Sequence, residues 1–209
     1  MITGPAAAER VNLTAPTSRI CKGKNGLAWL QGDNFIITVI KNQFIVAADL
    51  VDSPSDQGQL HPSLHTARET LDQAGIQQRM RAHLADAGFA STAAYTAQAE
   101  GILLISPVKE AVQTGRTTTT TRIKPGHEAM AARLATPAGK RLYRRRAGMV
   151  EPVFAHLFHH TGRRLHFRDA AKHTEICIMI TAHNAGKYFT HHRNPKPPNR
   201  AQPPYLTPT

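Results

Sequence analysis

Residues 35–48 indicate the fold class most clearly, because they read FIITVI-KNQ-FIVAA. Two apolar runs rich in β-branched residues, at 35–40 and 44–48, are joined by a short polar break. This pattern predicts an antiparallel hairpin. The runs are continuously apolar and do not alternate with polar residues, so both faces of the hairpin are expected to be covered.

The segments that follow predict further strands and helices. Leu60, Leu64, Ala67 and Leu71 recur at helical spacing up to residue 75. The order strand, strand, helix, strand, helix, strand predicts an α/β sheet with helices packed on it. The elements expected after the first helix are a strand at 82–85, a short helix at 91–99, a strand at 101–107, and helices at 150–158 and 175–189.

Three segments are expected to lie outside this core. Residues 1–18 are small and polar, and residues 191–209 are rich in proline, so both are predicted to be disordered. Residues 111–139 contain five successive threonines and are predicted to be an insertion or a flexible loop. One domain at 19–190 remains, which suits the 209-residue length.

The charge balance favours a polyanionic partner. Lysine and arginine total 26 against 14 acidic residues, a net charge of +12. Nucleic acid is the commonest such partner; a ribosomal protein, a membrane-surface protein or a chain lacking its acidic half are the alternatives. No apolar run approaches the length of a bilayer span, and Cys21 and Cys177 lack disulfide or metal-site spacing. We expect reduced cysteines and a cytoplasmic protein.

Two carboxylates stand at positions where chemistry is common. Asp86 follows the strand at 82–85 and precedes a glycine-containing turn, and ligands bind beyond strand ends in α/β sheets. Glu151 precedes Pro152, which is best tolerated in the first turn of a helix and so places Glu151 at a helix start. The alternative for Asp86 is a turn or helix cap, and for Glu151 a contact with the helix dipole.

The text around these carboxylates resembles insertion-sequence DDE transposases. ADAGFAS at 85–91 is similar to the family's "ADAGY.S", and VEPVF at 150–154 is similar to its "VEPVFG". Four further matches occur in the family's order: QGDN at 31–34, IVAAD at 45–49, GRRLHFR at 162–168 and HNAGK at 183–187.

The resemblance implies an RNase H-like fold in which three carboxylates hold two Mg²⁺ (or Mn²⁺) ions. Asp86 and Glu151 would be catalytic metal ligands, and the partners would be the DNA of transposon ends and target, with a homodimer left open. The family's first aspartate has no counterpart here, and Ala15 and Thr17 replace both aspartates of its "NLTDPDSR" motif. We therefore expect an N-terminally truncated, inactive domain, unless Asp49 or Asp52 substitutes for the missing ligand.

Basic residues bracket the Glu151 helix and are predicted to contact DNA phosphates, with a solvated charge run as the alternative. The predicted DNA-binding residues are Lys140, Arg141, Arg144, Arg145, Arg146, Arg163, Arg164, Arg168 and Lys187. The spacing of His156 and His160 allows a zinc site, but no cysteine or adjacent glutamate accompanies them, and a solvent-facing helix surface is favoured.

Three functional hypotheses follow from these patterns. The first is a transposase fragment that is inactive alone, and the second is a non-catalytic DNA-binding protein that kept the basic surface. The third is a nuclease in which another carboxylate completes the site.

Overall fold

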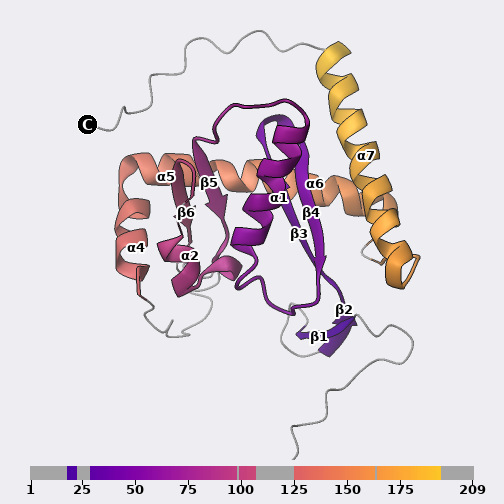
Figure 1. Cartoon of the computed structure of the whole chain (residues 1–209), viewed down its shortest axis with the longest axis horizontal. Coiled ribbons are helices and arrows are strands. Elements are labelled where there is room, and N and C mark those ends of the chain that lie inside the picture. The colour runs from indigo at the N-terminus through magenta and orange to yellow at the C-terminus, as the bar shows by residue number, and fades with distance from the viewer. Residues whose placement is uncertain (1–17, 23–28, 98, 107–124, 163, 194–209) are drawn as a thin grey trace, which may run out of the picture.

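The computed structural model describes residues 18–22, 29–97, 99–106, 125–162 and 164–193. These residues form a mixed α/β structure, which confirms the predicted class (Figure 1). The strands are β1 (Arg19–Lys22), β2 (Trp29–Gly32), β3 (Asn34–Val39), β4 (Ile45–Val51), β5 (Ala82–Ala85) and β6 (Ile102–Ile105). The helices are α1 (Leu60–Gln73), α2 (Thr92–Thr96), α4 (His127–Ala135), α5 (Pro137–Tyr143), α6 (Arg145–Thr161) and α7 (Asp169–Arg193), with short 3-10 turns at Lys41–Gln43 and Ala87–Phe89.

The hairpin predicted at 35–48 is confirmed by β3 and β4. They pair antiparallel, and Phe35 lies opposite Leu50. In the connecting turn, Asn42 and Gln43 both have φ of 65°, the left-handed region. Asparagine tolerates this region, whereas glutamine seldom occupies it, so contacts elsewhere must hold Gln43 in place.

Helices cover both faces of the hairpin, as its continuous apolar runs predict. α1 lies in front of the strands in Figure 1, and α6 crosses behind them. Val153 and Leu157 of α6 pack with Ile45 of β4 in one buried cluster, and Met179 of α7 lies against it. Burial of these apolar side chains is the main force that holds α6 and α7 to the hairpin.

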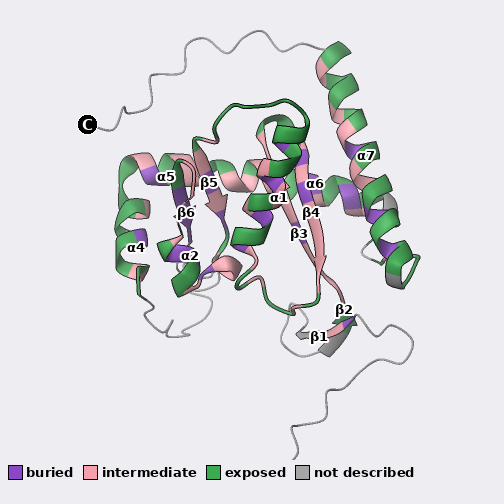
Figure 2. Ribbon diagram, in the orientation of Figure 1, coloured by how far each residue is buried: buried purple, intermediate pink, exposed green. Residues whose placement is uncertain are grey.

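A second buried cluster surrounds the parallel pair of β5 and β6. Ala82 lies opposite Ile102, and Ala85 lies opposite Ile105. Leu104 and Ile105 are 1% and 0% exposed, and Met130 of α4 packs against them. Figure 2 shows the same division, with buried residues on the inner sides of the helices and exposed residues outside.

The strands do not join into the one sheet that the element order predicts. Among the described residues, β1–β2, β3–β4 and β5–β6 form three separate two-stranded sheets. β3 and β4 share one apolar cluster with α6 and α7, and β5 and β6 share another with α4 and α1. Helix packing therefore organises this part of the chain more than a continuous hydrogen-bonded ladder does.

The predicted helices at 60–75 and 175–189 are confirmed by α1 and α7, and the helix at 91–99 shortens to α2. The prediction of a loop at 111–139 is wrong for its second part, because residues 127–135 form α4 and α5 begins at Pro137. Thr136 caps α5 by accepting a hydrogen bond from the Gly139 N–H, with Pro137 at the first helical position. Residues 111–124, 1–17 and 194–209 lie outside the described residues. No described helix has the length and apolar character needed to span a bilayer.

Candidate carboxylate site and basic surface

Asp86 lies directly after β5, and its carboxylate is exposed. Its Oδ1 accepts a hydrogen bond of 2.7 Å from the Gly88 N–H and so caps the 3-10 turn at Ala87–Phe89. The capping role that the sequence left as an alternative is therefore present. It engages one oxygen, and no hydrogen bond to Oδ2 occurs within the described part of the chain.

Asp56 lies beside Asp86, a proximity that the sequence did not indicate. A Cβ atom placed on Gly88 would lie 2.4 Å from Asp56 Oδ2 and 2.9 Å from Asp86 Oδ1, so the two carboxylates flank the same glycine. Asn34 of β3 donates a 2.8 Å hydrogen bond from Nδ2 to Asp56 Oδ1. Asp56 ends the turn after β4, and an acid in such a position was the only signal available from sequence.

Tyr143 and Arg146 lie near Asp86 on the side of α5 and α6. The Tyr143 hydroxyl donates a 2.9 Å hydrogen bond to the carbonyl of Ala85, the residue before Asp86. Burial raises the pKa of Tyr143, the Arg146 charge opposes this rise, and the Asp86 carboxylate adds to it. The Arg146 guanidinium lies 5.8 Å from the centre of the Tyr143 ring. A cation and a hydrogen-bonded phenol therefore accompany the carboxylate.

Glu151 does not stand at the start of its helix, which corrects the sequence interpretation. α6 begins at Arg145, and Pro152 lies in its interior. Proline removes the bond that its N–H would give to the carbonyl four residues earlier, that of Gly148. Here the Gln43 side-chain amide donates to that carbonyl at 3.4 Å. A residue from the hairpin turn thus partners the freed carbonyl.

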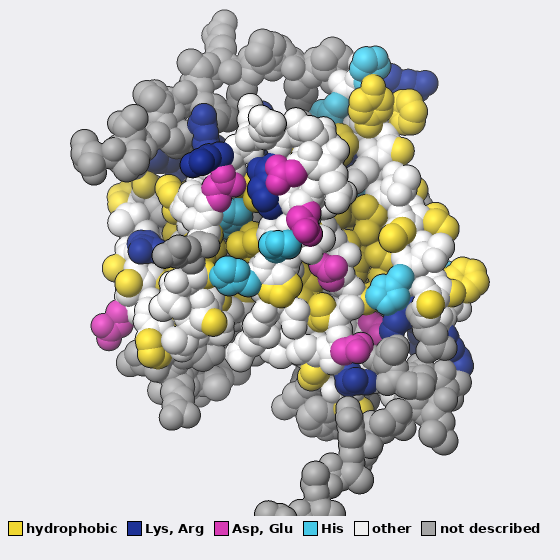
Figure 3. Space-filling view, viewed as in Figure 1, with side chains coloured by type: hydrophobic (Ala, Val, Ile, Leu, Met, Phe, Trp, Pro, Cys, Tyr) yellow, Lys and Arg dark blue, Asp and Glu magenta, His cyan; other side chains and the backbone are white. Residues whose placement is uncertain are grey.

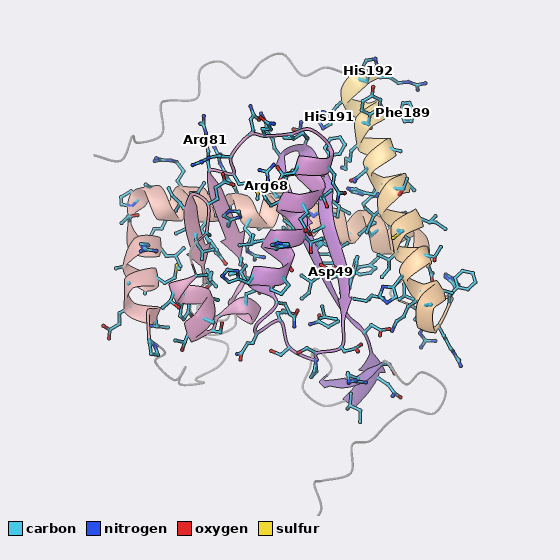
Figure 4. The ribbon with its side chains drawn as sticks, viewed as in Figure 1. Asp49, Arg68, Arg81, Phe189, His191 and His192 are labelled. Atoms are coloured by element: carbon cyan, nitrogen blue, oxygen red, sulfur yellow. The ribbon has the colours of Figure 1, made fainter. Side chains whose placement is uncertain are left out.

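The two predicted metal ligands are not brought into one cluster. Glu151 is exposed on α6, whereas Asp86 lies at the end of β5. Among the described residues, no group of three histidine, cysteine, aspartate or glutamate side chains could hold a metal ion. The alternatives Asp49 and Asp52 also lie apart: Asp49 is on β4 opposite Ile36, and Asp52 forms a 4.0 Å ion pair with Arg19. Figure 4 shows Asp49 beside the hairpin.

The basic residues after α4 surround a surface hollow. Its volume is about 410 Å³, and it is lined by Ala135, Pro137, Lys140, Arg141 and Arg144. The three cationic side chains are exposed. They have no ion pair with an acidic side chain in the described residues. We call this feature the basic hollow.

The other predicted DNA-binding residues occupy varied places. Arg145 is exposed and Arg146 half-buried at the start of α6, while Arg164 and Arg168 are exposed between α6 and α7. Arg163 lies outside the described residues.

Lys187 belongs to a set of contacts that fixes α7 to the hairpin turn. Its ammonium donates a 2.5 Å hydrogen bond to Gln43 Oε1. Asn184 accepts from the Ile45 N–H at 2.9 Å and donates to the Ile45 carbonyl at 2.8 Å, as a neighbouring strand would. The HNAGK segment at 183–187 therefore has a structural task that its sequence did not reveal, and DNA contact by Lys187 stays a prediction.

His183 completes this set and is only 2% exposed. Its Nε2 lies 2.8 Å from the Gln43 carbonyl, and its Nδ1 lies 3.1 Å from His156 Nδ1. A carbonyl only accepts, so Nε2 carries the proton of neutral His183, and His156 donates to Nδ1. His156 is thus an internal hydrogen-bond donor, and the side chain of His160 is not described. In Figure 4, His191 and His192 lie at the far end of α7.

The face of the molecule in Figure 3 has a different charge character from the basic hollow. Acidic, histidine and arginine side chains gather over α1. They include the pairs His65–Glu69 at 3.3 Å and Arg68–Asp72 at 2.7 Å, each one turn apart on α1. The acidic members would repel a polyanion from this face, whereas α6, which starts beside the basic hollow, lies on the opposite side of the strands (Figure 1).

An α/β structure with a carboxylate pair beyond a strand end and a neighbouring basic hollow fits a protein that handles phosphates. Residues 108–189 match the family described as "Transposase DDE domain". These residues are a portion of a DDE transposase domain, and the recognition made from sequence is confirmed for this part of the chain. Glu151 lies within the match and Asp86 lies before it. No curated protein and no solved structure matches the chain.

Proposed function

We propose that this protein acts in DNA transposition by binding the phosphate backbone of DNA at the basic hollow. The hollow carries the proposal, because Lys140, Arg141 and Arg144 line one concave surface. Side chains that contact phosphates fix a protein on the duplex without reading its sequence. The DNA would be that of transposon ends and target, as in the family whose domain residues 108–189 match.

We further propose that the domain derives from an RNase H-like transposase in which Asp86 binds Mg²⁺ or Mn²⁺. The Asp56–Gly88–Asp86 arrangement fits such an ion, because carboxylate oxygens flank a space that even one added methyl group would fill. A bound divalent cation would polarise a phosphate of the scissile strand. Arg146 and the basic hollow would hold the neighbouring phosphates, and Tyr143 would support the backbone at Ala85.

The binding proposal is tested by fluorescence anisotropy with a labelled DNA duplex. The variant carries Lys140→Gln, Arg141→Gln and Arg144→Gln, and the control carries Lys41→Gln, Arg81→Gln and Arg193→Gln at exposed positions elsewhere. Both lose the same net charge. We expect the affinity of the first variant to fall roughly tenfold or more at low salt and that of the control to change far less. Equal losses would contradict a specific role for the hollow.

A non-catalytic DNA-binding protein is the second candidate. It is favoured by one observation: the described residues contain no trio of carboxylates around Asp86. A plasmid-nicking assay with Mg²⁺ or Mn²⁺ separates the two candidates. Nicking abolished by Asp86→Asn supports the transposase chemistry, whereas DNA binding without nicking supports the second candidate.

A further inference from the structure

We infer that Asp56 supplies a second carboxylate, together with Asp86, for binding a hard divalent cation such as Mg²⁺ or Mn²⁺. This inference rests on the proposed function, because that proposal assigns Asp86 to the cation. It differs from the ligand set implied by the family resemblance, in which the partner of Asp86 is Glu151. It also replaces Asp49 and Asp52, the two substitutes that the sequence suggested.

The position of the Asp56 carboxylate carries the inference. Its Oδ2 and the Oδ1 of Asp86 approach the same point beside Gly88, at 2.4 Å and 2.9 Å from where a Cβ would be. Gly88 does not have a positive φ, so its lack of a side chain matters here for space and not for backbone conformation. The glycine leaves open the room between the two oxygens.

Asp56 is held in place by one oxygen only. Its Oδ1 accepts the hydrogen bond from Asn34 Nδ2, while Oδ2 has no hydrogen-bond or ion-pair partner among the residues that the structure describes. Capping does not explain this side chain. The residue before α1 is Gln59, and α1 has no side-chain cap. Asn34 thus orients the carboxylate and leaves the oxygen nearest Asp86 available.

The chemistry of the pair suits a hard cation. Two carboxylates close together repel one another unless a positive charge lies between them. Mg²⁺ is usually bound by one or two carboxylates, with water or substrate phosphate oxygens filling its other positions. Asp86 is exposed and Asp56 half-buried, so solvent and a DNA phosphate can reach the open side. A two-carboxylate site at this end of β5 therefore needs no contribution from Glu151.

Binding of Mn²⁺ alone tests the inference without any catalytic readout. Free Mn²⁺ is measured by electron paramagnetic resonance in titrations of the full-length protein and of Asp56→Asn, Asp86→Asn and Gly88→Ala. Gly88→Ala keeps both carboxylates and fills the space between them, so it tests the geometry separately from the charge. The matched controls are Asp52→Asn, which removes a nearby acid, and Gly148→Ala, whose added Cβ meets no atom within 4 Å. Circular dichroism establishes that each variant is folded.

We expect Asp56→Asn and Asp86→Asn each to weaken Mn²⁺ binding by roughly 10–100-fold, and Gly88→Ala to weaken it about tenfold. Both controls should match the unmodified protein. Unchanged affinity in folded Asp56→Asn or Gly88→Ala, or a comparable loss in Asp52→Asn, would overturn the inference. DNA binding measured in the presence of a chelator reports on the proposed function separately. A protein that binds DNA but whose Mn²⁺ affinity ignores Asp56 refutes only the inference, whereas Mn²⁺ binding through Asp56 without DNA binding refutes the proposed function.

Discussion

Asn184→Ala should destabilise the protein strongly, because it removes the side chain that pairs with the outer edge of β4. Asn184 makes two hydrogen bonds, of 2.9 Å and 2.8 Å, to the N–H and carbonyl of Ile45. Ile45 is only 4% exposed, so water cannot easily replace them. Each buried backbone group left without a partner costs about 1–3 kcal/mol. The gain in helix propensity from asparagine to alanine returns about 0.5 kcal/mol. We expect a net loss of about 3 kcal/mol in the free energy of unfolding.

Urea unfolding followed by circular dichroism measures this loss. Thr190→Ala is the matched control, since Thr190 is exposed on the same helix and its hydroxyl bonds only to the Gly186 carbonyl. The control should change stability by less than about 0.5 kcal/mol. A loss of that small size in Asn184→Ala, at an unchanged dependence on urea, would refute the view that α7 completes the edge of the hairpin.

Two further changes should also reveal the contacts of α7. Lys172→Met should lower stability by about 3 kcal/mol in thermal or urea unfolding, because Lys172 is buried and pairs with Asp33 at 2.5 Å; a neutral effect would mean that Asp33 finds other solvation. Burial raises the pKa of Glu175, but hydrogen bonds from the His166 N–H and ring and from the Phe167 N–H outweigh it and leave that pKa lowered. Its contribution to stability is therefore present above about pH 4.5 and lost as pH falls through the lowered pKa, so Glu175→Gln should flatten the acid limb of the stability–pH curve, and an unchanged limb would count against this role.

The elements with local patterns were predictable from sequence. The hairpin at 35–48 and the helix from Leu60 follow from apolar runs and helical spacing, which act within a few residues. Residues 127–139 were misassigned because the neighbouring threonine run suggested a loop, although Thr136 followed by Pro137 is a helix-start signal.

The remaining differences depend on residues far apart in the chain. Pro152 is accommodated within α6, and Gln43, 105 positions from Gly148, partners the freed carbonyl. Asp56 was missed as a site residue for the same reason, because only folding brings it beside Gly88 and Asp86. Asp86 was found from its place at a strand end, a local feature, and its role as a metal ligand stays a prediction.

The salt dependence of DNA binding tests the central claim most directly. The slope of log Kd against log salt concentration is measured for the unmodified protein and for the variant carrying Lys140→Gln, Arg141→Gln and Arg144→Gln. Each phosphate contact contributes about 0.9 to this slope on duplex DNA. If the three side chains of the basic hollow each contact a phosphate, the variant's slope will be smaller by about 2.7. Identical slopes for the two proteins would contradict the proposal that DNA binds at this surface.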